Sequence, residues 1–345
     1  MQKSRVKLVA VLMNVGLVVI LSGCASKTSS SSTGTSPVTS SGTSSAQPFK
    51  VAMLVTGPAN DGGWDSAAMA GLAKIKANLG AQTAYTENVA QSDQAQIMRN
   101  YASEGYNLII GDGFEYSDAL KQVASEYPNV KFAGIGSEGT APNLAVMTLR
   151  YGEDGYLLGV LCGSLTKTNK IGIVTATPDP TGKAEFDNVK TEAQAIDPKA
   201  TVTIAYTGSW SDVAKAKEAA LAQIADGCDI IIADCDVSNK GVFQAVVEKN
   251  VQAVGWSEDQ HDQAPNNILT SAVEDMSTLV YLAGEYYQNG TFTGQVYALG
   301  VKEGAQGLGS FDQAVPPALQ ATLKQDEQSI ANGSITPVLY NPTTD

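Results

Sequence analysis

The stretch Asn107-Leu-Ile-Ile-Gly-Asp112 recurs further along the chain as Asp229-Ile-Ile-Ile-Ala-Asp234. Each copy follows a segment with helical spacing that opens on a Ser-Asp pair, Ser92-Asp93 in the first copy and Ser211-Asp212 in the second. The copies lie about 120 residues apart, which is the spacing of repeated structural units rather than of neighbouring strands. The repetition predicts two α/β lobes of similar plan.

Outward from these two copies, short apolar runs alternate with longer segments of helical spacing. The runs are Lys50–Val55, Leu108–Ile110, Val130–Ile135, Lys170–Val174, Val202–Tyr206, Ile230–Ala233 and Val251–Gly255. This alternation is typical of parallel sheets with helices on both faces, so the sequence predicts an α/β protein. Two such lobes are expected to leave a ligand cleft between them.

The C-terminal part of the chain is expected to be shared between the lobes. A helix over Tyr151–Leu165 enters the second lobe, and the segment near Ser257–Thr270 carries the chain back. Lobe 1 is therefore expected to comprise residues 49–152 plus about 260–292, and lobe 2 residues 153–259 plus about 293–345.

Composition excludes several classes of function. The chain of 345 residues has 22 Lys and Arg against 35 Asp and Glu, a net charge of −13, which disfavours a nucleic-acid partner because such binding depends on neutralising phosphates. The four cysteines form no C-x-x-C pair for zinc, and one histidine leaves few positions for the commonest general base. We expect no metal, no cofactor and no catalysis.

The N-terminus has the layout of an export signal. Lys3, Arg5 and Lys7 precede an apolar run that ends at Leu21-Ser-Gly-Cys24. This tetrapeptide resembles a bacterial lipobox, which predicts a signal peptide over residues 1–23 and lipidation of Cys24. Residues 24–48 are rich in Ser and Thr and are expected to be a tether that holds an extracytoplasmic protein at the cell membrane. An ordinary signal peptide with a coincidental cysteine is the alternative.

All three tryptophans follow the carboxyl end of a predicted strand. Trp64, Trp210 and Trp256 therefore lie at the edge where open α/β sheets bind ligands. A single tryptophan at such a place usually fills its own core, but three at the same edge favour aromatic walls on a shared cleft. Flat walls predict a flat ligand, because a base stacks on an aromatic side chain.

Polar residues surround these tryptophans. Candidate ligand contacts in the first lobe are Asn60, Asp61, Asp65, Asp112, Phe114 and Asp118. Carboxylates are strong acceptors for ring N–H groups or sugar hydroxyls. Asp at a helix start is also the usual N-cap, which is the favoured interpretation for Asp93 and Asp212, while Asp61 and Asp118 remain open between cap and ligand contact.

Several dispersed motifs, taken in order, resemble the basic membrane protein family, the nucleoside-binding lipoproteins of bacterial ABC importers. The motifs are Asp61-x-x-Trp64-Asp65-x-x-Ala68, Gly111-x-Gly113-Phe114-x-x-Ser117-Asp118-Ala119, Gly152-x-x-x-Tyr156-Leu157-x-Gly159, Gly208-Ser209-Trp210-x-Asp212-x-x-Lys215 and Gly255-x-x-x-Asp259-Gln260. The resemblance implies a type I periplasmic-binding fold, a permease partner, and a purine sandwiched between two aromatics that map onto Trp64 and Trp210.

Two positions depart from the family's pattern. Where ribose-binding relatives show Gly-Val-Asp-x-Asp-Gln and Thr-Ser-x-x-Lys, this chain has Ser257 in place of the first carboxylate and Glu274 in place of the lysine. Two kinds of ligand therefore remain possible, a nucleoside held by other contacts and a free purine base. We hypothesise that Trp256 fills the space left by the missing side chains. An exported nucleoside hydrolase on the same fold and a sensor subunit are the competing functions.

Overall fold

The computed structural model describes residues 49–60 and 64–340. The predicted signal peptide, Cys24, the tether and Asp61 lie outside the described residues. Within the described part of the chain, no helix is long and apolar enough to cross a membrane. Residues 47–345 form one compact unit that contains two sheets.

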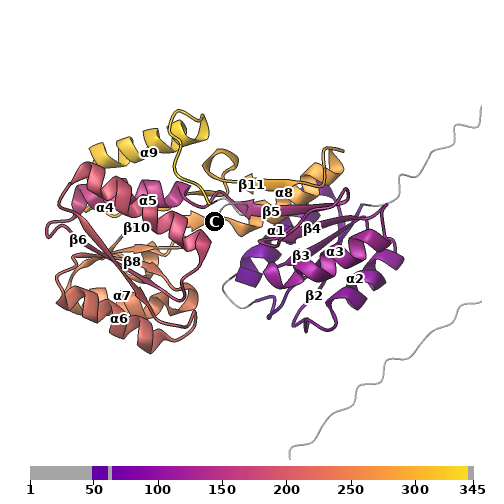
Figure 1. The fold of residues 1–345 in the computed structure, drawn as a ribbon, viewed down its shortest axis with the longest axis horizontal. Helices are drawn as coiled ribbons and strands as arrows, with labels where there is room; N and C mark the ends of the chain where they lie inside the picture. Colours follow the sequence, from indigo (N-terminus) through magenta and orange to yellow (C-terminus); the bar gives the residue numbers. More distant parts are fainter. Residues whose placement is uncertain (1–48, 61–63, 341–345) are drawn as a thin grey trace, which may run out of the picture. The chain divides into compact units, whose positions relative to one another are not determined.

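The first sheet is entirely parallel, with the strand order β11-β5-β4-β3-β1-β2 (Figure 1). Its strands are β1 (Lys50–Leu54), β2 (Gln82–Thr86), β3 (Leu108–Asp112), β4 (Lys131–Ile135), β5 (Leu144–Leu149) and β11 (Val296–Leu299). The central strands are buried on both faces, which explains why they read as unbroken apolar runs in the sequence.

Two helices cover each face of this sheet. The helices α1 (Trp64–Leu79) and α8 (Met276–Gln288) enclose one apolar cluster with β1 and β3, which includes Met53 and Ile110. The helices α2 (Gln94–Ser103) and α3 (Ser117–Glu126) enclose another on the opposite face, which includes Leu54 and Ile109. Alternate residues of one strand therefore face different cores, as the pleat requires.

The second sheet has the order β12-β10-β9-β8-β6-β7 and is parallel except for the edge strand β12. Its strands are β6 (Lys170–Thr175), β7 (Thr201–Tyr206), β8 (Ile230–Asp234), β9 (Gln252–Gly255), β10 (Ile268–Glu274) and β12 (Gln306–Leu308). Three helices, α4 (Glu153–Leu165), α5 (Pro180–Ile196) and α9 (Pro317–Ala331), cover one face, and α6 (Val213–Ala225) and α7 (Asn239–Lys249) cover the other. The predicted α/β class with two similar parallel-sheet lobes is confirmed.

The boundaries of the lobes were predicted wrongly in the C-terminal part of the chain. The strand β10, expected in lobe 1, pairs with β9 in the second sheet. The strand β11, expected in lobe 2, pairs with β5 in the first sheet. The chain therefore passes between the sheets three times, after β5, after β10 and after β11.

The N-cap predictions for Asp212 and Asp93 have different outcomes. The Asp212 carboxylate accepts a hydrogen bond from the Lys215 backbone N–H at 3.1 Å and so caps α6 as predicted. Asp93 precedes α2 but makes no side-chain capping bond, because its carboxylate accepts instead from the Ser92 hydroxyl. The cap prediction for Asp93 is therefore wrong.

Candidate ligand-binding cleft

A cavity of about 990 Å³ lies where the carboxyl ends of strands from both sheets meet. Its walls include Asp112 at the end of β3, Gly136 just after β4, Asp234 at the end of β8 and Trp256 just after β9. This is the edge at which open α/β sheets bind their ligands. The volume is large enough to enclose a small molecule.

All three tryptophans line this cavity. Trp64, the first residue of α1, is 37% exposed, and Trp210, in the loop before α6, is 43% exposed. Trp256 is only 3% exposed. Large apolar rings left accessible on a concave surface are characteristic of a binding site, so Trp64 and Trp210 are the open aromatic faces of the cleft.

The position of the Trp64 ring is fixed by two contacts. Its indole Nε1 donates a hydrogen bond to Asp112 Oδ1 at 2.9 Å. Its six-membered ring also lies against Gly136, where an added Cβ would come within 3.5 Å of a ring carbon. The indole is therefore held in place before any ligand binds, which lowers the entropic cost of stacking.

Asp112 is 1% exposed, and its Oδ2 atom has no hydrogen-bond partner among the described residues. Burial raises the pKa of Asp112 well above its usual value, the Trp64 hydrogen bond partly opposes this rise, and the neighbouring carboxylate of Asp65 adds to it. Asp65 itself accepts a hydrogen bond from the Gly57 backbone N–H at 2.6 Å. Asp65 thus also holds the loop that follows β1.

Trp256 belongs partly to the core of the second lobe. Its ring meets that of Phe186 edge-on, with centroids 6.2 Å apart. The neighbouring carboxyl group of Glu274 also lines the cavity. Burial raises the pKa of Glu274 to about 7, and the nearby Trp256 indole lowers it in part. The residue therefore serves the core and the cavity wall together.

Ser257 lines the cavity with a backbone φ of +75°, a left-handed conformation that side-chain-bearing residues rarely adopt. Its carbonyl oxygen accepts a hydrogen bond from the Glu274 backbone N–H at 2.9 Å. Ser257 and Glu274, the two positions expected to depart from the family's pattern, are therefore adjacent in the structure and share a hydrogen bond.

Not every predicted site residue reaches the cavity. Phe114, 69% exposed, lines it. Asn60 is exposed and Asp118 lies in the first turn of α3, and neither is among the described residues that line the cavity. The structure therefore brings together the predicted residues Trp64, Asp65, Asp112, Phe114, Trp210, Trp256, Ser257 and Glu274.

Five acidic residues of the second lobe that line the cavity were missed: Asp179, Glu185, Asp234, Asp236 and Glu258. Asp234 accepts a hydrogen bond from the Thr175 hydroxyl at 3.0 Å, and burial, followed by the charge of Glu274, raises its pKa well above its usual value. Asp179 caps α5 through the Gly182 N–H at 2.8 Å. Glu185 lines the cavity from within α5. Asp234 ends the repeated stretch as Asp112 does, and that symmetry is the signal that could have identified it.

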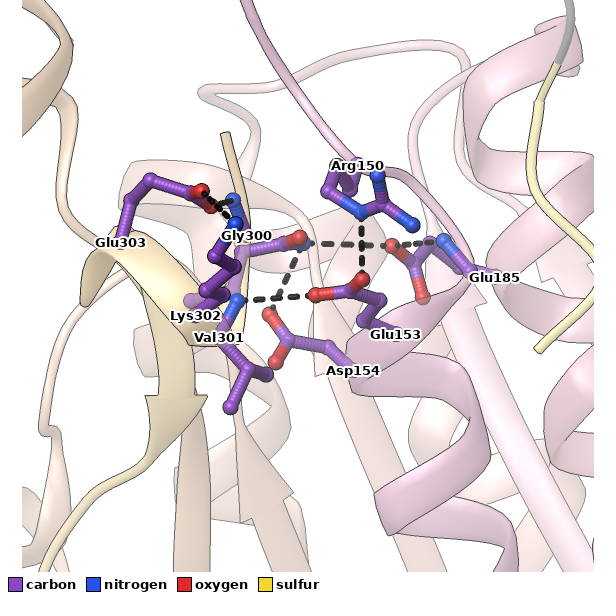
Figure 2. Close-up of polar contacts among 10 residues, drawn as sticks. Arg150, Glu153, Asp154, Glu185, Gly300, Val301, Lys302 and Glu303 are labelled. Carbon is purple, nitrogen blue, oxygen red and sulfur yellow. Dashed lines mark hydrogen bonds and ion pairs between the residues drawn. The ribbon is translucent and has the colours of Figure 1, made fainter. Parts of the chain in front are cut away.

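Buried carboxylates tie the segments between the sheets together. Glu153 accepts from Arg150 Nε at 2.5 Å and from the Val301 backbone N–H at 2.8 Å, as Figure 2 shows. It thereby joins the segment after β5 to the segment after β11.

Glu185 stabilises the same region from the second lobe. Its carboxylate accepts hydrogen bonds from the backbone N–H groups of Gly152 and Gly155, at 2.6 and 2.5 Å. Burial raises the pKa of Glu185 to about 8, although the two backbone hydrogen bonds oppose the rise. Gln306 donates to both Asp154 and Glu185, at 3.3 and 3.5 Å.

The cleft has the chemistry of a binding site more clearly than that of a metal centre or a nucleotide-cofactor site. The described residues contain no group of three or more His, Cys, Asp or Glu side chains placed to hold a metal ion. The Gly134-x-Gly136-x-x-Gly139 motif follows β4 but is succeeded by β5, not by the helix that a dinucleotide fingerprint needs.

Two α/β lobes with a lined cavity at their strand ends define a solute-binding protein of the type I periplasmic class. A solute-binding protein of an ABC transporter system from Conexibacter woesei is similar, with a TM-score of 0.71, 26% identity, and coverage of 85% of this chain and 100% of that chain. The structure of a transcriptional activator of the comK gene from Bacillus halodurans shares the fold, with a TM-score of 0.75, 24% identity, and coverage of 84% and 99%.

The family description "ABC transporter substrate-binding protein PnrA-like" matches residues 49–339, so the chain belongs to this family, known as Bmp. It is 27% identical to the purine-binding protein BAB2_0673 of Brucella abortus over 84% of this chain and 83% of that protein. It is 30% identical to basic membrane protein D of Borreliella burgdorferi, over 83% of each. The predicted family is therefore confirmed, and membership implies a small-molecule solute and permease partners.

Proposed function

We propose that this protein is the extracytoplasmic solute-binding lipoprotein of an ABC importer and that it captures a purine nucleoside or a purine base. One observation carries the proposal: Trp64 and Trp210, from opposite lobes, leave accessible indoles on one cavity. Stacking between two such rings favours a flat solute whatever its substituents. The similarity to a protein named as purine-binding supports the same ligand class.

Capture proceeds by lobe closure. The solute first stacks on Trp64, which is held by Asp112, and the second lobe then brings Trp210 against the opposite face. The closed form gains contacts that the open form lacks, so the ligand shifts the equilibrium towards it. The permease recognises the closed form. Because the solute has to leave again, we expect submicromolar to micromolar dissociation constants, about −8 to −10 kcal/mol.

A nucleoside and a free base would make different contacts with Ser257 and Glu274. A ribose needs donors and acceptors in fixed positions, and this chain has a hydroxyl and a carboxylate where relatives have a carboxylate and an ammonium. Calorimetric titration of adenosine and of adenine separates the two ligands. A hundredfold preference for adenosine would discard the free-base version.

Attachment to the membrane is proposed through Cys24. A tether over residues 24–48 has an r.m.s. reach of roughly 25–30 Å, which keeps the binding domain near its permease. Replacement Cys24→Ser is expected to move the protein from the membrane fraction to the soluble extracytoplasmic fraction. Retention in the membrane fraction would contradict lipid anchoring.

A sensor role is a second candidate, because two similar proteins are named as transcriptional activators, one of them the protein med of Bacillus subtilis. Co-purification of the ligand-bound protein with permease subunits separates the roles. An exported hydrolase is the third candidate, and recovery of unchanged adenosine after long incubation with the protein would exclude it for that ligand.

A thermal-shift screen tests the proposed function as a whole. Purine bases and nucleosides are expected to raise the midpoint of unfolding, since a ligand that binds only the folded state stabilises it. Pyrimidines and sugars serve as the comparison ligands. Stabilisation by a sugar and by no purine would overturn the purine assignment while leaving the solute-binding class intact.

A further inference from the structure

The side chains that line the cavity are far more often acidic than basic. Among the described residues that line it, ten bear a side-chain carboxylate and one, Lys240, bears an ammonium. Three of the carboxylates are the last residues of their strands: Asp112 ends β3, Asp234 ends β8 and Glu274 ends β10. They therefore point into the cavity from strand ends in both sheets, where the backbone holds them rigidly.

Two of these carboxylates accept hydrogen bonds from neutral donors, Asp112 from the Trp64 indole and Asp234 from the Thr175 hydroxyl. The third, Glu274, lies beside the Trp256 indole. Within residues 49–60 and 64–340, none of the three forms an ion pair with a Lys, Arg or His side chain. Asp112 Oδ2 is buried without any partner there.

The aromatic walls complete the arrangement. Trp64, Trp210 and Phe114 are accessible rings on the same cavity. The face of an aromatic ring attracts a cation, most strongly for tryptophan, and the attraction grows as water is removed. Carboxylates beside indole faces are therefore a surface that favours a positively charged ring over a neutral one of the same shape.

We propose that the solute held in this cleft carries a positive charge on or beside a flat ring, with the charge placed near Asp234 and Glu274 and the ring stacked on the indoles. This inference rests on the proposed function, because it takes the cavity as the solute site. Closing the lobes over a neutral solute would remove water from these carboxyl groups, which would then have to take up protons or remain charged at a cost. A cation supplies a countercharge.

The pKa shifts of the cavity carboxyl groups agree with this. Burial raises the pKa of Glu274 to about 7 and raises the pKa of Asp234 well above its usual value. A rise of this kind is what desolvation produces when no cation stands nearby, and a bound cation reverses it.

The test uses two isomers with the same atoms. At neutral pH 1-methyladenosine is a cation, whereas N6-methyladenosine is neutral. Both are titrated calorimetrically into the full-length protein. We expect the cation to bind at least tenfold more tightly. Equal affinity, or preference for the neutral isomer, would overturn the inference and leave the proposed purine function standing.

Two variants test whether Glu274 and Asp234 cause the preference for a cation. Glu274→Gln keeps the size and polarity of the side chain but removes the carboxylate, and it is expected to reduce the ratio of the two affinities about tenfold, chiefly by weakening binding of the cation. Asp234→Asn is the second variant, should the first fail to fold. Glu218→Gln, on the exposed surface of α6, is the matched control and is expected to leave the ratio unchanged. An unchanged ratio in a folded cleft variant would overturn the inference.

If neither adenosine isomer binds, the proposed purine function is rejected, but the proposed positive charge of the solute is not. A second pair, the cation 1-methylnicotinamide and neutral nicotinamide, then decides the inference. Binding of the cation alone supports it. Equal binding of both, or binding of neither, overturns it.

Discussion

Trp64 and Asp112 form a single unit at the carboxyl edge of the first sheet. The indole Nε1 donates to the carboxylate Oδ1 at 2.9 Å, which holds the aromatic wall and satisfies one oxygen of a buried acid together. The ring is therefore positioned by the same group that contributes negative charge to the cavity. Stacking and electrostatics in this cleft are coupled through one hydrogen bond.

Trp64→Phe is expected to cost about 1–3 kcal/mol of unfolding free energy, because it leaves the carboxylate of Asp112 without its donor. The loss grows as pH rises. In the wild type the Trp64 hydrogen bond lowers the pKa of Asp112. Without this bond, the folded variant holds the Asp112 proton up to a higher pH, at which the unfolded chain has already released it. The folded state is therefore increasingly disfavoured as pH rises. Urea unfolding at several pH values measures this.

The double variant Trp64→Phe, Asp112→Asn is the control. Its amide does not titrate, so the additional pH dependence is expected to vanish. The same pH dependence in single and double variants would show that Asp112 is not its source.

Trp210→Ala is expected to weaken purine binding by about 1–3 kcal/mol through lost stacking, with little effect on thermal stability, because the side chain is exposed. Tyr206→Ala is the matched control: this exposed aromatic belongs to the same lobe but is not among the residues that line the cavity. Calorimetric titration measures both. Unchanged purine affinity in Trp210→Ala would contradict the proposal that the ligand stacks on Trp210.

Glu185→Gln is expected to flatten the pH dependence of stability. Burial raises the pKa of Glu185 to about 8 in the folded protein, against a usual value of 4.5. Between these values the folded protein holds a proton that the unfolded chain has released. Stability is therefore greatest at low pH and falls as pH rises through this window, by at most about 1.4 kcal/mol per pH unit for this group.

Chemical unfolding of the wild type and of Glu185→Gln between pH 5 and pH 8 measures this slope. Glu218→Gln, on the exposed surface of α6, controls for loss of a charge alone. A steeper fall in Glu185→Gln than in the wild type would contradict the assignment.

Ser257→Gly is expected to raise the free energy of unfolding by about 1 kcal/mol, because glycine adopts the observed positive φ without strain. Asn250→Gly is the control, since asparagine tolerates its φ of +53° well. Denaturant unfolding measures both. Destabilisation by Ser257→Gly would show that the hydroxyl contributes more than the backbone conformation costs.

Sequence patterns predicted most of the core strands and the edge strand β7, but not the interior strand β5 (Leu144–Leu149) or the other edge strands. Strands such as β3 and β8 are buried on both faces and so appear as unbroken apolar runs. The edge strand β2, Gln82–Thr86, is largely accessible and polar, so it carries no such signal. The strand β10 pairs with β9, which directly precedes it, whereas β11 pairs with β5 about 150 residues earlier, a partner that no local pattern encodes.

The cleft was predictable to the extent that it follows from strand ends. Trp64, Trp210 and Trp256 were found because the edge at which parallel strands end is known in advance. Asp179 and Glu185 were missed because a helix cap and a residue inside a helix give no sign that they face a cavity. The backbone hydrogen bonds of Glu185 join α5 to the start of α4, about 30 residues earlier, and form only when these helices pack together.

The most direct test of the central claim is a crystal structure of the protein with adenosine or adenine bound. We predict the purine in the cavity between the rings of Trp64 and Trp210, with each indole in van der Waals contact at roughly 3.5–4 Å. A purine bound elsewhere, or one that contacts neither indole face, would contradict the account.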